Sequence, residues 1–263
     1  MNLQEKPLEN LVSDGGFCAI FRHIGCIGDS LASGELESLK DGVKGYHDYY
    51  EHSWGQYLAR MCGSTAYNFS TGGLTAKAFL ERIDEDRFNI FDPEKKCEAY
   101  IVALGCNDAR MVMEGQLEFG SIDDVHPEDP DANAETFAGY MGRILSDIRQ
   151  IEPKARIFLV TMPYMEPDER QALRDRHAAL MHEMTLKFDY TYVIDLRKYG
   201  PEYDGEFKFR YYLGGHLNTM GYLLTAKMIA SYIDYIIRHN PEDFAQAGFI
   251  GRGNDLHNES RKW

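Results

Sequence analysis

Apolar and polar residues alternate in blocks along this chain. Short apolar runs, rich in branched and aromatic residues, fit strands that are buried on both faces of a sheet. These runs span residues 24–27, 66–69, 100–104, 157–161 and 192–194. Between them lie segments with the helical spacing of apolar residues, at 53–62, 75–83, 134–151, 167–187 and 218–239. The pattern predicts an α/β fold.

Strands that alternate with helices form a parallel sheet that helices cover on both faces. Right-handed crossovers bring the carboxyl end of every strand to one edge of this sheet, where the connecting loops can assemble a site. Polar residues that directly follow the predicted strands are therefore the first candidates for chemistry.

The length of 263 residues and the hydrophobic content of 44% suit one domain with a sizeable core. We place this core at about residues 20–240. The acidic, proline-interrupted segment 111–133 is expected to be an insertion near the carboxyl edge of the sheet. Residues 241–263 lack periodicity and are expected to form a surface tail.

Charge and cysteine content narrow the classes of partner. The formal net charge of −14 repels nucleic-acid backbones and anionic membranes. No segment reaches 18 uninterrupted apolar residues and residues 1–10 lack a secretion signal, so we expect a cytoplasmic protein if no signal was removed. The five cysteines include no C-x-x-C pair and no zinc-ligand spacing, which predicts reduced thiols and no metal.

Ser30 directly follows the first predicted strand, in the segment HIGCIGDSL. A serine at such a turn is most often a helix cap. The turn also lacks the second glycine of a G-x-S-x-G nucleophile elbow, because Ala32 occupies that place. The alternative is a nucleophile held at the carboxyl end of a strand, and Ser30 by itself does not decide between the two.

Three further blocks follow the later strands. Gly72 and Gly73 fit a tight turn, and they also allow backbone N–H groups to face a cleft. Asn107, in GCND, either forms an Asx turn or donates a side-chain hydrogen bond to an oxyanion. His216 follows two glycines and precedes the last predicted helix, where a base could reach a hydroxyl.

The order of these four blocks resembles that of the GDSL family, also called SGNH hydrolases, over about residues 23–240. The resemblance implies a single domain, a three-layer α/β/α sandwich with a parallel flavodoxin-like sheet. It also implies a serine-dependent carboxylic ester hydrolase that uses no metal and no cofactor.

By the same resemblance, Ser30 is the nucleophile and His216 is the base. The implied oxyanion hole consists of the backbone N–H groups of Ser30 and Gly73, with Gly72 as the less favoured register, and the side chain of Asn107. Two neighbours of these blocks are candidates for substrate binding: Asp29 and Arg110.

The chain departs from the family where an aspartate usually stands three residues before the histidine, because Leu213 occupies that position. A backbone carbonyl near Leu213, or Asp204 or Glu206 from the preceding loop, could substitute. The missing acid also makes an inactive glycan-binding module an alternative function. Cys106, inside GCND, is interpreted as a buried thiol and not as a nucleophile.

The segments expected near the site, 31–54 and 204–215, are rich in tyrosine and polar residues. Aromatic faces with hydrogen-bonding edges suit sugar rings better than acyl chains. We therefore predict the removal of an acetyl or other short acyl group from a small-molecule or oligosaccharide ester through an acyl-enzyme. A general short-chain carboxylesterase, lysophospholipase or thioesterase is the alternative. The 17 tyrosines are equally compatible with a homo-oligomer interface.

Overall fold

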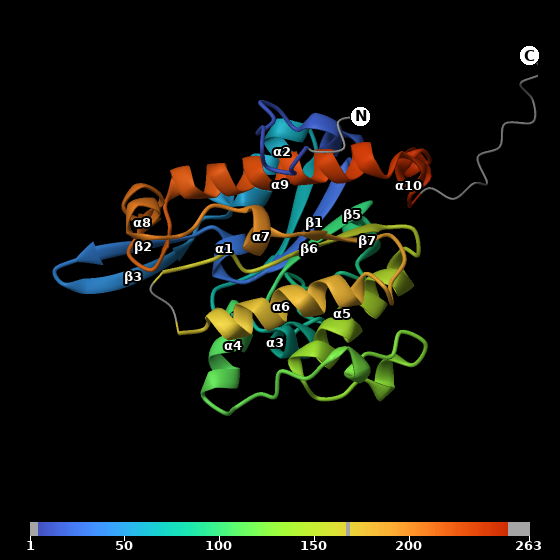
Figure 1. Cartoon of the computed structure of the whole chain (residues 1–263), viewed down its shortest axis with the longest axis horizontal. Coiled ribbons are helices and arrows are strands. Elements are labelled where there is room, and N and C mark those ends of the chain that lie inside the picture. Colours follow the sequence, from blue (N-terminus) through green and yellow to red (C-terminus); the bar gives the residue numbers. More distant parts are fainter. Residues whose placement is uncertain (1–4, 167–168, 252–263) are drawn as a thin grey trace, which may run out of the picture.

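A parallel sheet of five strands forms the centre of the molecule (Figure 1). The computed structural model describes residues 5–166 and 169–251. The strands are β1 (His23–Gly28), β4 (Thr65–Ser70), β5 (Ala99–Ala103), β6 (Arg156–Val160) and β7 (Thr191–Ile194). Their order across the sheet is β4-β1-β5-β6-β7, so the chain leaves β1 in both directions, which is the flavodoxin-like order. All five predicted strands are confirmed.

Helices cover both faces of the sheet, as Figure 1 shows. One face carries α2 (Trp54–Cys62) and α9 (Thr219–His239). The other carries α3 (Ala76–Glu81), α5 (Phe137–Ile151) and α6 (Gln171–Met184). These five helices match the five predicted helical segments, and the three-layer sandwich is confirmed.

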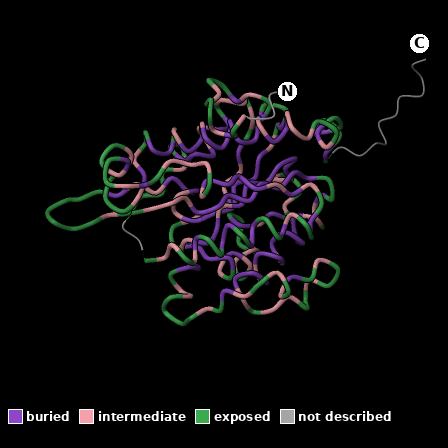
Figure 2. The backbone as a smooth tube through the Cα atoms, viewed as in Figure 1, coloured by how far each residue is buried: buried purple, intermediate pink, exposed green. Residues whose placement is uncertain are grey.

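Side chains alternate along the strands between two apolar clusters. In β5, Ala99 and Ile101 pack on the α2 and α9 side, whereas Tyr100 and Val102 pack on the α3, α5 and α6 side. Continuous apolar strands are expected when both faces are covered. The buried residues concentrate along the sheet and the inner faces of the helices (Figure 2).

The remaining elements lie mostly in the connections at the carboxyl edge of the sheet. The short helices are α1 (Ser30–Ser33), α4 (Cys106–Met113), α7 (Leu196–Tyr199), α8 (Gly205–Tyr211) and α10 (Pro241–Phe244). Strands β2 (Glu35–Lys40) and β3 (Val43–Asp48) form an antiparallel hairpin that projects from the body (Figure 1). Strands β8 (Tyr212–Leu213) and β9 (His216–Leu217) form a second, shorter one.

Two expectations about loops were wrong. The segment 111–133 starts at the carboxyl edge with the end of α4, but it then runs along α5 and buries Phe119 and Val125 in the core. The expected surface tail begins with α10 and buries Phe244 and Ile250. In both segments, isolated apolar residues without periodicity supply the packing. Residues 252–263 of the tail lie outside the described part of the chain.

Candidate active site

The turn after β1 places Ser30 at the carboxyl edge of the sheet. Asp29 is the N-cap of α1, and its Oδ1 accepts a hydrogen bond of 3.0 Å from the Leu31 N–H. Ser30 is therefore the first residue of the helix and not its cap. A side chain at Gly28 would lie 2.6 Å from the Cβ of Ala32, so glycine lets the helix fold back closely over the strand end.

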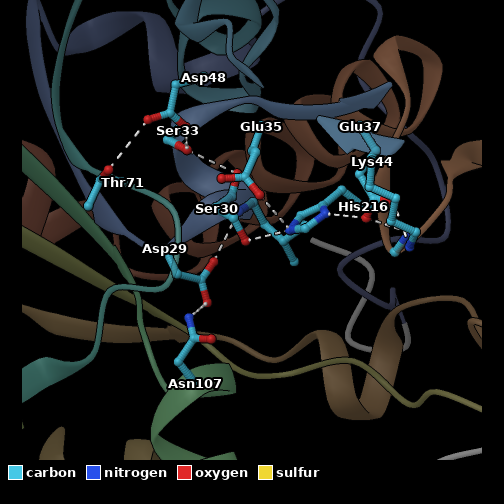
Figure 3. A network of polar contacts seen from close by, with 12 residues as sticks. Asp29, Ser30, Ser33, Glu35, Glu37, Lys44, Asp48, Thr71, Asn107 and His216 are labelled. Carbon is cyan, nitrogen blue, oxygen red and sulfur yellow. Dashed lines mark hydrogen bonds and ion pairs between the residues drawn. The ribbon is translucent and has the colours of Figure 1, made fainter. Parts of the chain in front are cut away.

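His216 contacts Ser30 from the other end of the sequence. The Ser30 hydroxyl lies 3.0 Å from Nε2 of His216, which stands on β9 (Figure 3). The two residues are separated by 186 positions in the chain. This is the arrangement in which an imidazole can accept the hydroxyl proton.

Glu37, on the β2–β3 hairpin, occupies the place of the missing acid (Figure 3). Its Oε1 lies 2.8 Å from Nδ1 of His216 and accepts a hydrogen bond of 2.7 Å from the Gly215 N–H. Lys44 donates to Oε2 at 3.3 Å. A carboxylate only accepts, so Nδ1 of His216 carries the proton and Nε2 faces Ser30. Burial by itself would raise the pKa of Glu37, but the hydrogen bonds from these three groups together lower it below its ordinary value.

The substitutes considered for the missing acid were wrong. Asp204 caps α8 by accepting a 2.8 Å hydrogen bond from the Phe207 N–H, and Glu206 pairs with Arg210 at 2.6 Å. No backbone carbonyl takes the role either, because Nδ1 of His216 is bonded to Glu37.

The glycine pair before His216 makes room for the Glu37 carboxylate. A Cβ at Gly214, where φ is +69°, would lie 2.0 Å from Oε2 of Glu37, and one at Gly215 would lie 2.8 Å from Oε1. The segment GGH was thus the sequence signal of a close neighbour. Nothing in the sequence pointed to Glu37 as that neighbour.

A second carboxylate reaches the same imidazole from β2. Glu35 lies two residues before Glu37, so both side chains leave the same face of the strand. Oε1 of Glu35 is 3.1 Å from Nε2 of His216, on the nitrogen that also contacts Ser30. Burial, only partly offset by His216, raises the pKa of Glu35. Sequence analysis missed this residue as well.

The three predicted donors to an oxyanion lie around the turns that follow β1, β4 and β5. The Asn107 amide donates 3.2 Å to the Leu74 carbonyl and lies 3.5 Å from Oδ2 of Asp29. Gly73 has a positive φ of +74°. Within residues 5–166 and 169–251, the backbone N–H groups of Ser30 and Gly73 have no hydrogen-bond acceptor.

Two buried carboxyls support these turns. Burial raises the pKa of Asp29 to about 6, and it raises that of Asp108 to about 7. Oδ1 of Asp108 accepts a 2.9 Å hydrogen bond from the Ala76 N–H, which ties α4 to α3. Asp29 is thus a buried capping residue, and its contacts are with Leu31 and Asn107.

A hydrogen bond from His177 holds the turn that carries Asn107. This residue is buried, and its Nε2 lies 2.9 Å from the Leu104 carbonyl. Burial lowers the pKa of His177 to about 4, so the ring is neutral and donates to that carbonyl. Gly105, with φ of +130°, passes so close that a Cβ would lie 2.6 Å from Nε2 of His177.

Arg110 follows Asn107 by one helical turn on α4 and is exposed. It lines a cleft of about 850 Å³ together with Gly214 and Gly215, the residues that precede His216.

Cys106, at the start of α4, is partly buried. In the described part of the chain, no group of histidine, cysteine and acidic residues is arranged to hold a metal ion.

Fold and site together define a class of protein: three-layer α/β/α sandwiches in which a serine and a histidine meet at the carboxyl edge of a flavodoxin-like sheet. Comparison with known protein families identifies the family within this class. The model of the GDSL-like Lipase/Acylhydrolase family matches residues 26–224, and the chain belongs to this family.

Solved structures with the same fold are distant in sequence. A carbohydrate esterase family 2 enzyme with a carbohydrate-binding domain, from Corynascus thermopiles (Myceliophthora fergusii), is 17% identical with a TM-score of 0.58; the match covers 82% of this chain and 67% of that one. A family two carbohydrate esterase from Clostridium thermocellum, in complex with cellohexaose, is 16% identical with a TM-score of 0.57 and coverages of 84% and 65%. The chain thus spans about two thirds of the length of each.

A shorter neighbour, the acetyl xylan esterase AlAXEase, is 13% identical with a TM-score of 0.51 and coverages of 80% and 99%. At these identities the likeness concerns the fold. A search of curated proteins found no match. Among the described residues, no helix is long and apolar enough to cross a membrane.

Proposed function

We propose that this protein hydrolyses carboxylic esters through an acyl-enzyme on Ser30, with His216 as the base and Glu37 as the acid of the triad. The observation that carries the proposal is the continuous contact from the Ser30 hydroxyl to His216 at 3.0 Å and from His216 to Glu37 at 2.8 Å. Membership in an acylhydrolase family supports it.

The proton moves along this contact. As Oγ of Ser30 attacks the ester carbonyl, Nε2 of His216 takes the hydroxyl proton, and the carbonyl becomes a tetrahedral oxyanion. When the intermediate collapses, the same proton passes to the leaving alcohol. Water then attacks the acyl-enzyme with His216 again as base, which releases the carboxylic acid and restores Ser30. Glu37 stabilises the imidazolium that forms twice in this cycle.

The oxyanion requires donors that are free to reach it. We assign this role to the N–H groups of Ser30 and Gly73, which lack an acceptor among the described residues. The amide of Asn107 joins them by exchanging its 3.2 Å hydrogen bond to the Leu74 carbonyl for one to the oxyanion. Each such donor contributes on the order of 3 kcal/mol to transition-state stabilisation in other hydrolases.

Two features favour a sugar ester as substrate. Tyr46 lies opposite Glu37 on the hairpin, its ring is 5.9 Å from that of His216, and it is 57% exposed. An exposed aromatic ring beside the base offers a surface on which a sugar can stack. Carbohydrate esterases among the fold neighbours agree with this substrate class. We therefore propose that a short acyl group is removed from a carbohydrate.

The inactive glycan-binding alternative rested on the missing aspartate. Glu37 in contact with His216 removes that reason. The general short-chain esterase or thioesterase remains an alternative that acyl-chain selectivity distinguishes.

The test compares wild type with Ser30→Ala on para-nitrophenyl acetate and on acetylated oligosaccharides. We expect the substitution to lower kcat by at least about 10³-fold, because it removes the nucleophile. Equal rates would exclude Ser30 as nucleophile. Faster hydrolysis of long-chain than of acetyl esters, with no acetate released from the oligosaccharides, would replace the sugar substrate by a lipid one.

A further inference from the structure

A cleft of about 850 Å³ adjoins the proposed site. One wall is the turn Gly214–Gly215 that leads into His216, and the other is the outer part of α4, which begins with the Asn107 turn. The base must protonate the leaving alcohol, so the alcohol part of the ester has to lie on the His216 side. The cleft is therefore placed to receive that part of the substrate.

Arg110 lines this cleft and has no partner among the described residues. In the described part of the chain its guanidinium makes no hydrogen bond, ion pair or ring contact, although it carries five N–H donors. Glu114 lies four residues later on the same helix and lines the same cleft, yet the two do not pair. Most other arginines in the described part of the chain pair with carboxylates or carbonyls, as Arg238 does with Glu5 and Asp234.

Two more basic residues line the cleft. Lys208 reaches in from α8, where its ammonium donates to the Glu166 carbonyl, and Arg170 precedes α6. The acidic residues in the lining are Glu114 and Glu169, both exposed. The cleft thus has three basic and two acidic residues in a chain whose formal net charge is −14.

Carboxylates lie close to the proposed catalytic residues. Glu35 and Glu37 flank His216, and Asp29 lies beneath the turn. An anionic group on the substrate is repelled from these carboxylates and attracted toward Arg110. An anion is therefore favoured at the α4 wall of the cleft, where Arg110 stands, and disfavoured beside His216.

We propose that Arg110 binds an anionic group, a carboxylate or a phosphate, on the alcohol part of the ester, so that the substrate is an acylated acidic sugar. This inference rests on the proposed esterase function and adds its substrate class. Arg110 acts here as a specificity residue. The planar guanidinium can hold a carboxylate or a phosphate through two parallel hydrogen bonds.

The experiment measures kcat/KM for three matched esters: an acetylated methyl glucoside, the corresponding acetylated methyl glucuronide and an acetylated methyl glucoside phosphate. The variants are Arg110→Gln and Arg110→Glu. The matched control is Arg22→Gln, which removes the same charge from an exposed arginine at the opposite, amino edge of the sheet. Comparison of the two anionic esters tells whether carboxylate or phosphate is preferred.

We expect wild type to prefer at least one anionic ester over the neutral one by about tenfold or more. Arg110→Gln should reduce this preference by about 10- to 100-fold, mainly through KM, as loss of a charge-assisted hydrogen bond does. Arg110→Glu should reverse the preference, and Arg22→Gln should preserve it.

Two results would overturn the proposal: a wild-type enzyme that hydrolyses the neutral ester as well as both anionic ones, or a preference that survives in Arg110→Glu. Results that contradict the proposed esterase function itself can be distinguished from these two. In that case none of the three esters is hydrolysed, or hydrolysis persists in Ser30→Ala.

Discussion

The replacement Glu37→Gln separates the two tasks of the proposed triad acid. Both the Gly215 N–H and Nδ1 of His216 converge on Oε1 of Glu37, at 2.7 and 2.8 Å. A glutamine would therefore place its carbonyl oxygen at this position and turn its amide nitrogen toward Lys44, which is exposed and free to move. The variant keeps an acceptor for Nδ1, and hence the tautomer of His216, but loses the negative charge.

The size of the effect follows from the charge alone. Two unit charges about 4 Å apart interact by roughly 1 kcal/mol in water and roughly 4 kcal/mol at the effective dielectric constant of a protein surface. The Glu37 side chain is only 6% exposed, so we expect about 2–3 kcal/mol of lost imidazolium stabilisation. This corresponds to a decrease in kcat of about 30- to 150-fold.

Glu37→Leu removes the acceptor as well as the charge. The ring is then free to take the wrong tautomer or to rotate, and loss of the orienting acid in a well-studied triad costs on the order of 10⁴-fold. We expect kcat to fall by about 10³- to 10⁴-fold. The ratio between the two variants therefore reports how much of the role of Glu37 is orientation.

The assay is steady-state hydrolysis of para-nitrophenyl acetate, with thermal melts to confirm that each variant is folded. Glu183→Gln is the matched control, because Glu183 is exposed on α6 away from the site. Wild-type turnover in Glu37→Leu would refute the triad. A loss in Glu37→Gln as large as that in Glu37→Leu would refute the argument that the glutamine retains the tautomer.

Three further predictions address the surroundings of the site. Glu35→Gln removes a carboxylate 3.1 Å from Nε2 of His216 that stabilises the imidazolium; kcat should fall by about fivefold, as the loss of roughly 1 kcal/mol of charge stabilisation predicts, and an unchanged kcat would contradict this role. Burial raises the pKa of Asp108 to about 7, so the folded protein holds a proton that the unfolded chain releases near pH 4; stability should fall as the pH rises from about 4 to about 7. Thermal melts of Asp108→Asn should show a smaller drop in Tm between about pH 5 and about pH 8 than wild type. An identical drop would show that a group other than Asp108 causes the pH dependence of stability. Gly105→Ala forces a side chain into φ of +130° and against His177, so urea melts should show a loss of about 2 kcal/mol or more and kcat should fall with the displaced Asn107 turn; a neutral effect would show that this turn tolerates movement.

The sheet and its helices could be predicted from the sequence because each strand is buried on both faces and each helix has an apolar stripe. The β2–β3 hairpin was not predicted. Its strands expose most of their residues, among them Leu39 and Val43 at 72% and 70%, so no alternation marks a buried face. Burial patterns reveal elements that pack on a core, and this hairpin packs mainly at its base.

The residues of the candidate site also fall into two groups, those that could be located from the sequence and those that could not. Residues that follow the strands, such as Ser30 and Asn107, could be located because the topology of a parallel sheet places them at one edge. Glu37 could not, because it reaches His216 from a connection whose course depends on long-range contacts: Ser33 with Asp48 at 2.6 Å, and Tyr222 with the Glu35 carbonyl at 2.6 Å. The cytoplasmic location and a homo-oligomer interface stay predictions.

The hairpin has a thermodynamic consequence. A two-stranded ribbon is marginally stable by itself, and this one contributes the carboxylate that aligns the imidazole while sharing little of the interior. Its opening costs less free energy than melting of the five-stranded sheet. Mild denaturant should therefore abolish activity at concentrations where the circular dichroism spectrum of the domain is still native. Activity and global folding are then lost in separate transitions.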